Sequence, residues 1–204
     1  MTDGRKVGVG PHPLPRPEDN RFDRELLANG DRRNVLDEYR YWTRDAIIAD
    51  LDTKRLGFHV AIENFQHDFN IGTIVRNANA FLAHTVHIVG KRRWNKRGAM
   101  VTDTYQHVDY HPTVDGFVAW AEGAGLPLIG IDIRAGSEPI ESAPVPERCV
   151  LVFGQEGPGL SDEMVGHCVS VLHITQHGST RSINVGVASG IAMHELIRRQ
   201  GTVG

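Results

Sequence analysis

The sequence has little cysteine and no long apolar run. Two cysteines occur among its 204 residues, Cys149 and Cys168, and they form neither a CxxC pair nor a disulfide framework. No apolar stretch approaches the roughly 20 residues that cross a bilayer, and residues 1–20 lack the apolar core of a signal peptide. These absences disfavour zinc-binding, disulfide-stabilised, secreted and membrane proteins, and they predict a cytoplasmic protein without a membrane partner.

Two common nucleotide-binding patterns are also missing. The chain contains neither the G-x-G-x-x-G fingerprint of dinucleotide binding nor the G-x-x-x-x-G-K-[ST] phosphate loop. None of its 11 histidines lies in an HExxH pattern. An oxidoreductase that binds a nicotinamide cofactor is therefore a weak alternative, and we expect no metal.

The net charge of −3 is nearly neutral, so a nucleic-acid partner would contact local basic patches rather than the whole surface. The strongest patch is the segment 91–97 (KRRWNKR), which holds five cationic residues around a tryptophan. We expect this segment to bind RNA, with the tryptophan able to stack on a base. A solvated charged loop is the simpler alternative. The residues expected to contact RNA are Arg92, Arg93, Trp94, Lys96 and Arg97.

The chain divides by composition into three parts. Residues 1–20 are rich in glycine, proline and charge, which predicts a mobile arm. Residues 21–56 are expected to form a helical extension, because apolar residues recur at helical spacing between 33 and 51 and indicate a helix or a helix pair. From 57 to 204, strand-like and helix-like runs alternate, which is typical of an α/β domain with a mainly parallel sheet covered by helices. The expected runs lie at 58–62, 71–83, 85–89, 113–124, 126–131, 149–153, 161–168, 169–174 and 182–199, and 135–148 is expected to be a loop.

Three blocks in this domain combine a buried strand, a glycine-containing loop and a helix. In the first, the strand leads to Asn70 at the expected N-cap of the next helix, while Arg76 lies off the apolar stripe of that helix. A helix cap explains Asn70 as well as a functional role does. Arg76 is isolated from any charge run, and this makes it a candidate functional residue.

In the second block, the strand 149–153 ends in the glycine-rich loop 154–160 (GQEGPGL). Parallel α/β sheets bind their ligands at the carboxyl ends of the strands, and glycine permits backbone angles that other residues avoid. A tight turn explains the glycines but not the acid at position 156. We therefore expect Glu156 to belong to a ligand-binding loop.

In the third block, the loop 178–181 (GSTR) precedes a helix that Ser182 is expected to cap. Small residues at 186, 188, 189, 190 and 192 give this helix a surface for close packing, which indicates a buried or intersubunit helix. A flexible loop before a core helix explains the small residues. It does not explain the trio of Arg181, Ser182 and Asn184.

Together, the three blocks resemble the motifs of the SPOUT superfamily, specifically its SpoU (TrmH-like) branch of tRNA and rRNA ribose 2′-O-methyltransferases. The first motif, N-x-G-x-x-x-R, is matched by Asn70, Gly72 and Arg76. The second motif is matched by Gly154, Glu156 and Gly157. The third, I-P-M-x-G-x-x-x-S-L-N-V, is similar to 174–185 (ITQHGSTRSINV), with departures at Thr175, Gln176 and Ile183.

The resemblance implies a fold, a cofactor and an assembly. The sheet would carry helices on both faces, and the last two motifs would form a deep trefoil knot, a topology nearly absent from other proteins. S-adenosylmethionine would bind in a bent shape inside the knotted loops. The helices of the first and third motifs would form a homodimer, with the small residues of 186–192 suited to the interface and Arg76 reaching the partner's cofactor.

The resemblance also implies roles for individual residues in methyl transfer to a ribose 2′-hydroxyl of tRNA or rRNA. The residues implied in catalysis are Arg76, Asn70, Ser182, Asn184 and Glu156. The residues implied in cofactor binding are Asp132, Gly154, Glu156, Gly157, Ile174, Gln176, Ser182 and Ile183. Because a guanidinium stays protonated in proteins, we expect Arg76 to act as an electrostatic clamp rather than as a base.

Two alternatives stay open. SPOUT relatives also methylate base atoms, although the pairs Asn70/Arg76 and Ser182/Asn184 point to ribose. The second alternative is an RNA-binding protein that has lost catalysis, and the presence of Arg76 argues against it.

Overall fold

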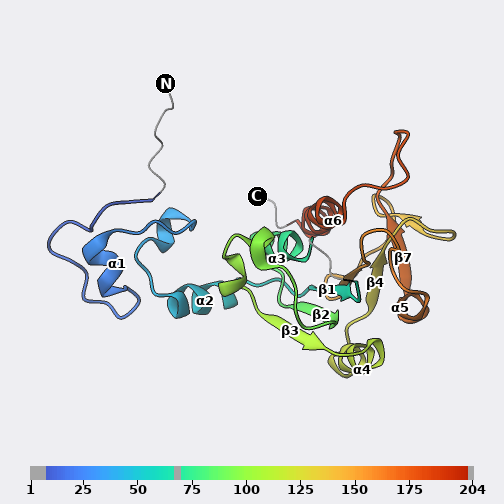
Figure 1. The fold of residues 1–204 in the computed structure, drawn as a ribbon, viewed down its shortest axis with the longest axis horizontal. Helices are drawn as coiled ribbons and strands as arrows, with labels where there is room; N and C mark the ends of the chain where they lie inside the picture. Colours follow the sequence, from blue (N-terminus) through green and yellow to red (C-terminus); the bar gives the residue numbers. More distant parts are fainter. Residues whose placement is uncertain (1–7, 67–69, 202–204) are drawn as a thin grey trace. The chain divides into compact units, whose positions relative to one another are not determined.

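The computed structural model of the chain describes residues 8–66 and 70–201. The chain forms two compact units, Met1–Lys54 and Arg55–Gly204, so the second unit begins two residues before the expected start at 57. Figure 1 shows short helices in the first unit and the sheet in the second. Within the described residues, no helix combines the length and the apolar character that a bilayer span requires.

The N-terminal unit contains α1 (Arg24–Asn29), the 3-10 turn η1 (Asp37–Tyr39) and α2 (Arg44–Asp52). Between η1 and α2, Tyr41 has a positive φ of 63° and interrupts the helical course expected over 33–51. The buried Asp31 carboxylate organises the unit, because it accepts hydrogen bonds from the Arg33 guanidinium (2.7 Å) and the Tyr41 N–H (3.0 Å). Burial opposes ionisation of Asp31, but these hydrogen bonds lower its pKa to about 2.

The segment 8–20, the described part of the expected mobile arm, makes backbone contacts within this unit. Val9 and Asp31 exchange two backbone hydrogen bonds of 2.8 and 3.0 Å, and the Tyr41 hydroxyl donates to the Gly10 carbonyl at 2.6 Å. Main-chain hydrogen bonds need no apolar side chains, so a composition poor in apolar residues does not reveal such an attachment. Residues 1–7 of the expected arm lie outside the described residues.

The C-terminal unit is built on a seven-stranded sheet of order β3-β2-β1-β6-β4-β7-β5, in which all paired strands are parallel. The strands are β1 (His59–Asn64), β2 (Val86–Gly90), β3 (Val108–His111), β4 (Leu128–Ile131), β5 (Glu138–Pro139), β6 (Val150–Phe153) and β7 (Ser170–His173). The predicted α/β fold with a parallel sheet is confirmed. Sequence patterns missed β3, which is half-exposed at one edge, and β5, which is two residues long inside the loop expected at 135–148.

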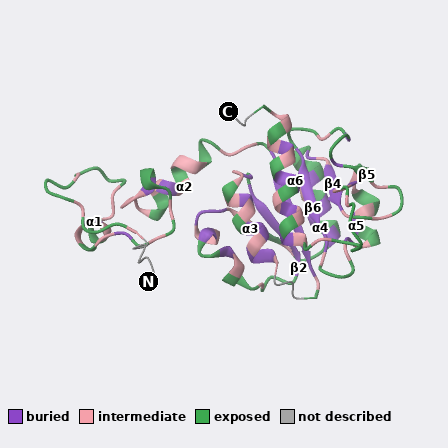
Figure 2. Cartoon of the chain, turned by 90° about the horizontal axis from the view of Figure 1, so that it is seen from above, coloured by how far each residue is buried: buried purple, intermediate pink, exposed green. Residues whose placement is uncertain are grey.

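Helices cover both faces of this sheet. They are α3 (Ile71–Ala80), α4 (Val114–Ala124), α5 (Asp162–His167) and α6 (Val185–Arg199). Two 3-10 turns, η2 (Lys96–Ala99) and η3 (Thr102–Thr104), lie between β2 and β3. Val60 and Ile62 of β1 pack in one apolar cluster with α3 and α6, whereas Ala61 packs in another with α4 and α5. This division follows from the alternation of side chains along a strand. Figure 2 shows the buried strands between the helices.

A row of histidines crosses the sheet face that α4 covers. His59, His87 and His111 lie on the adjacent strands β1, β2 and β3, and facing ring nitrogens are 3.0 Å apart in both neighbouring pairs. His87 is completely buried, with the Trp120 ring of α4 4.0 Å away. Burial lowers the pKa of His59 to about 4 and that of His87 to about 2, so both are neutral at pH 7. Among the described residues, no three His, Cys, Asp or Glu side chains are grouped to hold a metal ion.

Candidate functional site

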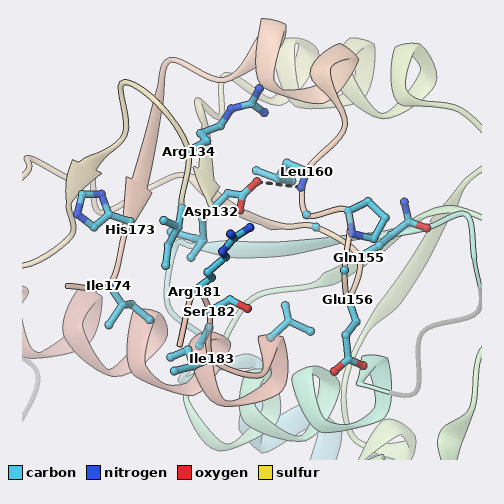
Figure 3. A pocket seen from close by; sticks show the side chains of 18 of the residues that line it. Asp132, Arg134, Gln155, Glu156, Leu160, His173, Ile174, Arg181, Ser182 and Ile183 are labelled. Carbon is cyan, nitrogen blue, oxygen red and sulfur yellow. Dashed lines mark hydrogen bonds between the residues drawn. The ribbon is translucent and has the colours of Figure 1, made fainter. Parts of the chain in front are cut away.

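A pocket of about 640 Å³ lies at the carboxyl ends of β4, β6 and β7, the edge where parallel α/β sheets bind ligands. Figure 3 shows its wall, which is formed by the segments that follow these strands and by the start of α6. All eight residues expected in cofactor binding line this pocket. They are Asp132, Gly154, Glu156, Gly157, Ile174, Gln176, Ser182 and Ile183.

The loop 154–160 folds back tightly on itself. Gln155 and Gly159 exchange two backbone hydrogen bonds of 3.0 Å, and the Phe65 N–H donates to Gln155 Oε1 at 3.0 Å. A Cβ on Gly154 would lie 2.1 Å from the carbonyl carbon of Gly159, and one on Gly159 would lie 2.7 Å from Asp132 Oδ2. Gly159 also has a φ of 74°, which side chains rarely adopt. Glycine is therefore required at both positions, and the loop presents its backbone to the pocket.

Two carboxylates anchor the end of this loop. The Leu160 N–H donates to Asp132 Oδ2 at 3.1 Å. Glu63, fully buried in β1, accepts hydrogen bonds from the N–H (2.8 Å) and the hydroxyl (2.6 Å) of Ser161, and burial raises the Glu63 pKa. The sequence reading did not include Glu63 among the site residues, although an acid inside an apolar strand is a usable signal, because a buried carboxylate needs partners.

Asn70 joins the three motif blocks at the edge of the pocket. Its side-chain amide donates to Glu156 Oε2 at 2.7 Å, and its amide oxygen accepts a hydrogen bond from Asn184 Nδ2 at 2.9 Å. Glu156 and Asn184 both line the pocket. Asn70 therefore contacts one residue of each of the other two blocks, 86 and 114 residues away in the sequence.

The N-cap of α3 is the predicted residue, whereas the N-cap of α6 is not. Asn70 occupies the N-cap position of α3, but its side chain makes no capping hydrogen bond. Ser182 does not cap α6, because that helix begins at Val185 and Asn184 is its N-cap, accepting hydrogen bonds from the N–H groups of Gly186 (2.9 Å) and Val187 (3.3 Å). The predicted N-cap position of Asn70 is therefore confirmed, and the prediction that Ser182 caps α6 is wrong. An asparagine nearer the first turn satisfies those N–H groups and leaves Ser182 exposed at the pocket.

Arg76 is exposed on α3 and does not line the pocket of its own chain. Within the part of the chain that the structure describes, its guanidinium has no hydrogen bond or ion pair. The expectation that Arg76 lies off the apolar stripe of its helix is confirmed, because the buried residues of α3 are all apolar or glycine. Its guanidinium is free to bind a group from outside the chain.

The basic segment 91–97 follows β2 and is largely exposed. Trp94 differs from its neighbours, since its ring is half-buried against the apolar core and Lys96 Nζ lies 5.6 Å from the ring centroid. Lys96 also forms an ion pair with Asp103 at 2.8 Å. Arg92, Arg93 and Arg97 are the exposed arginines of the segment.

The small residues of α6 pack against α3 of the same chain. A Cβ on Gly186 would lie 2.9 Å from Thr73 Cγ2, and the Asn77 amide donates to the Gly186 carbonyl (2.8 Å) and to Ser189 Oγ (3.0 Å). The expectation of a buried helix is therefore confirmed at Gly186 and Ser189, and a role of the small residues in a dimer interface stays a prediction. Close approach of the two helix backbones within one chain accounts for them.

A model of the SpoU rRNA Methylase family matches residues 57–194, a span that holds all three motif blocks. The chain belongs to the SpoU rRNA methylase family. The resemblance inferred from the motifs is therefore confirmed.

Relatives of this SpoU family chain include uncharacterized tRNA/rRNA methyltransferases of mycobacteria. The protein from Mycolicibacterium smegmatis is 29% identical over 69% of this chain and 46% of its own length. The protein from Mycobacterium sp. (strain KMS) is 28% identical over 95% of this chain and 63% of its own length. The chain thus spans about half to two thirds of the length of these relatives.

Solved structures of RNA-modifying enzymes share the fold. The A. aeolicus TrmH/SpoU tRNA modifying enzyme matches with a TM-score of 0.68 and 21% identity, over 78% of this chain and 85% of that chain. The AdoMet-bound rRNA methyltransferase from Sinorhizobium meliloti matches with a TM-score of 0.64 and 25% identity, over 73% of this chain and 60% of that chain.

Proposed function

We propose that this chain transfers a methyl group from S-adenosylmethionine to a ribose 2′-hydroxyl of tRNA or rRNA. The observation that carries the proposal is the pair of hydrogen bonds that joins Asn70 to Glu156 and to Asn184 at the pocket edge. These bonds gather one polar residue from each SpoU motif beside the pocket. The family match and the AdoMet-bound relative from S. meliloti support the same cofactor.

The pocket suits S-adenosylmethionine in size and chemistry. Its volume of about 640 Å³ falls within the range of about 300–1,000 Å³ found for small-molecule sites. Ile174 and Ile183 offer apolar surface to an adenine, and the carboxylates of Asp132 and Glu156 suit a ligand that carries a sulfonium and an ammonium group. When bound, S-adenosylmethionine supplies an electrophilic methyl group.

Arg76 would act by electrostatic stabilisation of the reacting ribose. A guanidinium has a pKa above about 12 and does not accept the hydroxyl proton. It would instead bind the ribose oxygen and the adjacent phosphate as negative charge develops, and the phosphate or a water would take the proton. Since this scheme uses no group that titrates near neutrality, the rate of methyl transfer should depend little on pH.

The other polar residues would position the substrate. Asn70 and Asn184, already hydrogen-bonded to each other, would orient the ribose with the help of Ser182. Glu156 would hold the cofactor loop through its bond to Asn70. Positioning of this kind supplies a large part of the rate in group-transfer reactions. The exposed Arg92, Arg93, Lys96 and Arg97, together with the half-buried Trp94, would contact the RNA.

A homodimer with a shared active site accounts for the place of Arg76 in this scheme. Its exposed guanidinium lies outside the pocket of its own chain and would reach the cofactor of the partner. Val187 and Ile191 of α6 are 54% and 40% exposed and offer an apolar surface to that partner. We also propose that the loops of the second and third motifs form the SPOUT trefoil knot. The strand order β1-β6-β4-β7 is compatible with such a knot.

Transfer of labelled methyl groups into separate tRNA and rRNA pools that lack modification tests this function, with Arg76→Ala as the control. A ribose 2′-O-methyl group blocks alkaline cleavage at its own phosphodiester. Label in alkali-resistant dinucleotides that disappears with Arg76→Ala is the expected result. Label in mononucleotides would indicate base methylation, and cofactor binding without any transfer to either RNA would indicate a non-catalytic RNA-binding protein.

A further inference from the structure

Most charged side chains that line the pocket already have a partner. Arg134 donates a hydrogen bond to Asp162 at 2.7 Å, and Glu156 accepts one from Asn70 at 2.7 Å. Arg181 is the exception, because it lines the pocket, is exposed, and has neither a hydrogen bond nor an ion pair to any described residue. The pocket therefore contains a cation whose five N–H donors are available to a ligand.

The position of Arg181 is set by the start of α6. Asn184, three residues further on, caps α6 and bonds to Asn70, and the intervening Ser182 and Ile183 line the pocket. Figure 3 shows the Arg181 guanidinium pointing into the pocket toward Asp132. The backbone next to Arg181 is thus attached to the motif cluster, and its side chain extends over the ligand site.

We infer that Arg181 binds the α-carboxylate of the methionine part of S-adenosylmethionine, an inference that rests on the proposed function. This cofactor carries one anionic group. A guanidinium fork matches a carboxylate with two parallel N–H···O bonds, and the match is stronger where water is partly excluded. The Glu156 carboxylate, which lies away from Arg181 in Figure 3, repels the same group and disfavours that side of the pocket.

Two ligands that differ only in the amino-acid end test this assignment. S-adenosylhomocysteine has the carboxylate, whereas 5′-methylthioadenosine keeps the adenosine and the sulfur but lacks the amino-acid end. Isothermal titration calorimetry on the full chain would compare Arg181→Ala and Arg181→Lys with the native protein. The matched control is Arg24→Ala, which removes an exposed arginine of α1 in the N-terminal unit.

Arg181→Ala should lower the affinity for S-adenosylhomocysteine about tenfold and leave the affinity for 5′-methylthioadenosine within about twofold. Arg181→Lys should recover part of the loss, because it keeps the charge but not the fork. The control should match the native protein with both ligands. The native protein should bind S-adenosylhomocysteine more tightly than 5′-methylthioadenosine. This difference in affinity should decrease at high salt, because exposed charges are screened.

Three results would overturn the inference. If Arg181→Ala weakened the binding of both ligands equally, Arg181 would maintain the conformation of the loop rather than bind the carboxylate. An unchanged affinity for S-adenosylhomocysteine, with weaker tRNA or rRNA binding, would assign it to an RNA phosphate. If the native chain bound neither nucleoside, the proposed function itself would fail. If the native chain bound both nucleosides and Arg181→Ala bound them with the same affinities, only the role of Arg181 would be refuted.

Discussion

Acidification from pH 7.5 to 5 should destabilise the C-terminal unit through its histidine row. Burial is the main cause that lowers the pKa of His59 to about 4 and that of His87 to about 2, from an ordinary value of 6.5. The other groups that act on the row are His84 and Arg148, which disfavour protonation, and Asp109, which favours it at His111. Below pH 6.5 the unfolded chain therefore binds more protons than the folded chain, so stability is present above this pH and is lost as the pH falls.

The size of the effect follows from the two pKa values. At pH 5 the unfolded chain carries nearly one extra proton at each of His59 and His87, and each proton lowers the free energy of unfolding by about 2 kcal/mol. Together, the two histidines lower the free energy of unfolding by about 4 kcal/mol between pH 7.5 and 5. In this range the free energy of unfolding falls by up to about 2.7 kcal/mol for each pH unit. This is a large effect for a domain of ordinary stability.

Urea unfolding between pH 5 and 7.5, followed by tryptophan fluorescence, measures this slope. Trp120 lies against the row and reports on it. In His87→Phe the slope should fall by about half, because one of the two protons is no longer taken up, whatever the stability of the variant at pH 7.5. His167→Phe replaces an exposed histidine of α5 and should leave the slope unchanged.

Two results would refute this reasoning. The free energy of unfolding could stay level from pH 7.5 to 5, which would mean that the folded chain protonates the row as readily as the unfolded chain does. Alternatively, the native slope could persist in His87→Phe, which would place the proton uptake at other groups.

Further predictions concern the site and the RNA surface. Asn70→Ala should lower the rate of methyl transfer by about tenfold or more. It should change the free energy of unfolding by less than about 1 kcal/mol, since the hydrogen bonds that it removes join exposed groups. A larger loss of stability would make the role of Asn70 structural. Gly154→Ala should abolish cofactor binding in calorimetry, because its Cβ would lie 2.1 Å from loop backbone. Reversing the charges of Arg93 and Arg97 should weaken RNA retention on filters by about tenfold or more while cofactor affinity stays constant, and a joint loss would contradict an RNA-binding role. The rate of methyl transfer should change little between pH 6.5 and 8.5, and an apparent pKa near that of histidine would contradict the clamp role of Arg76.

Local patterns were sufficient to locate most of the secondary structure of the C-terminal unit. Each expected run from 58 to 199 corresponds to a strand or a helix, because apolar periodicity and glycine positions act over a few neighbouring residues. The ends of the elements are less well predicted. At α6, both Ser182 and Asn184 are competent caps, and the choice depends on the backbone angles at the helix start.

The residues that line the pocket were predicted from the three motifs together and not from any single residue. Gly154 and Gly159 could be assigned to a tight loop from their residue type alone. By contrast, Asp132 has no local pattern that marks it, and only the resemblance implied that it faces the same site as Ile174 and Ile183.

The sequence by itself determined the element types, the glycine-rich loops and the family. Only the tertiary structure decided which distant side chains meet. Because β6 lies between β1 and β4, the loop with Glu156 ends beside Asn70. The register of β1, β2 and β3 pairs His87 with Ala61 and Asp109, so His59 and His111 lie two positions away on the same face and contact His87 diagonally. Neither arrangement follows from spacing along the chain, since strand order and register are set by the packing of the whole sheet.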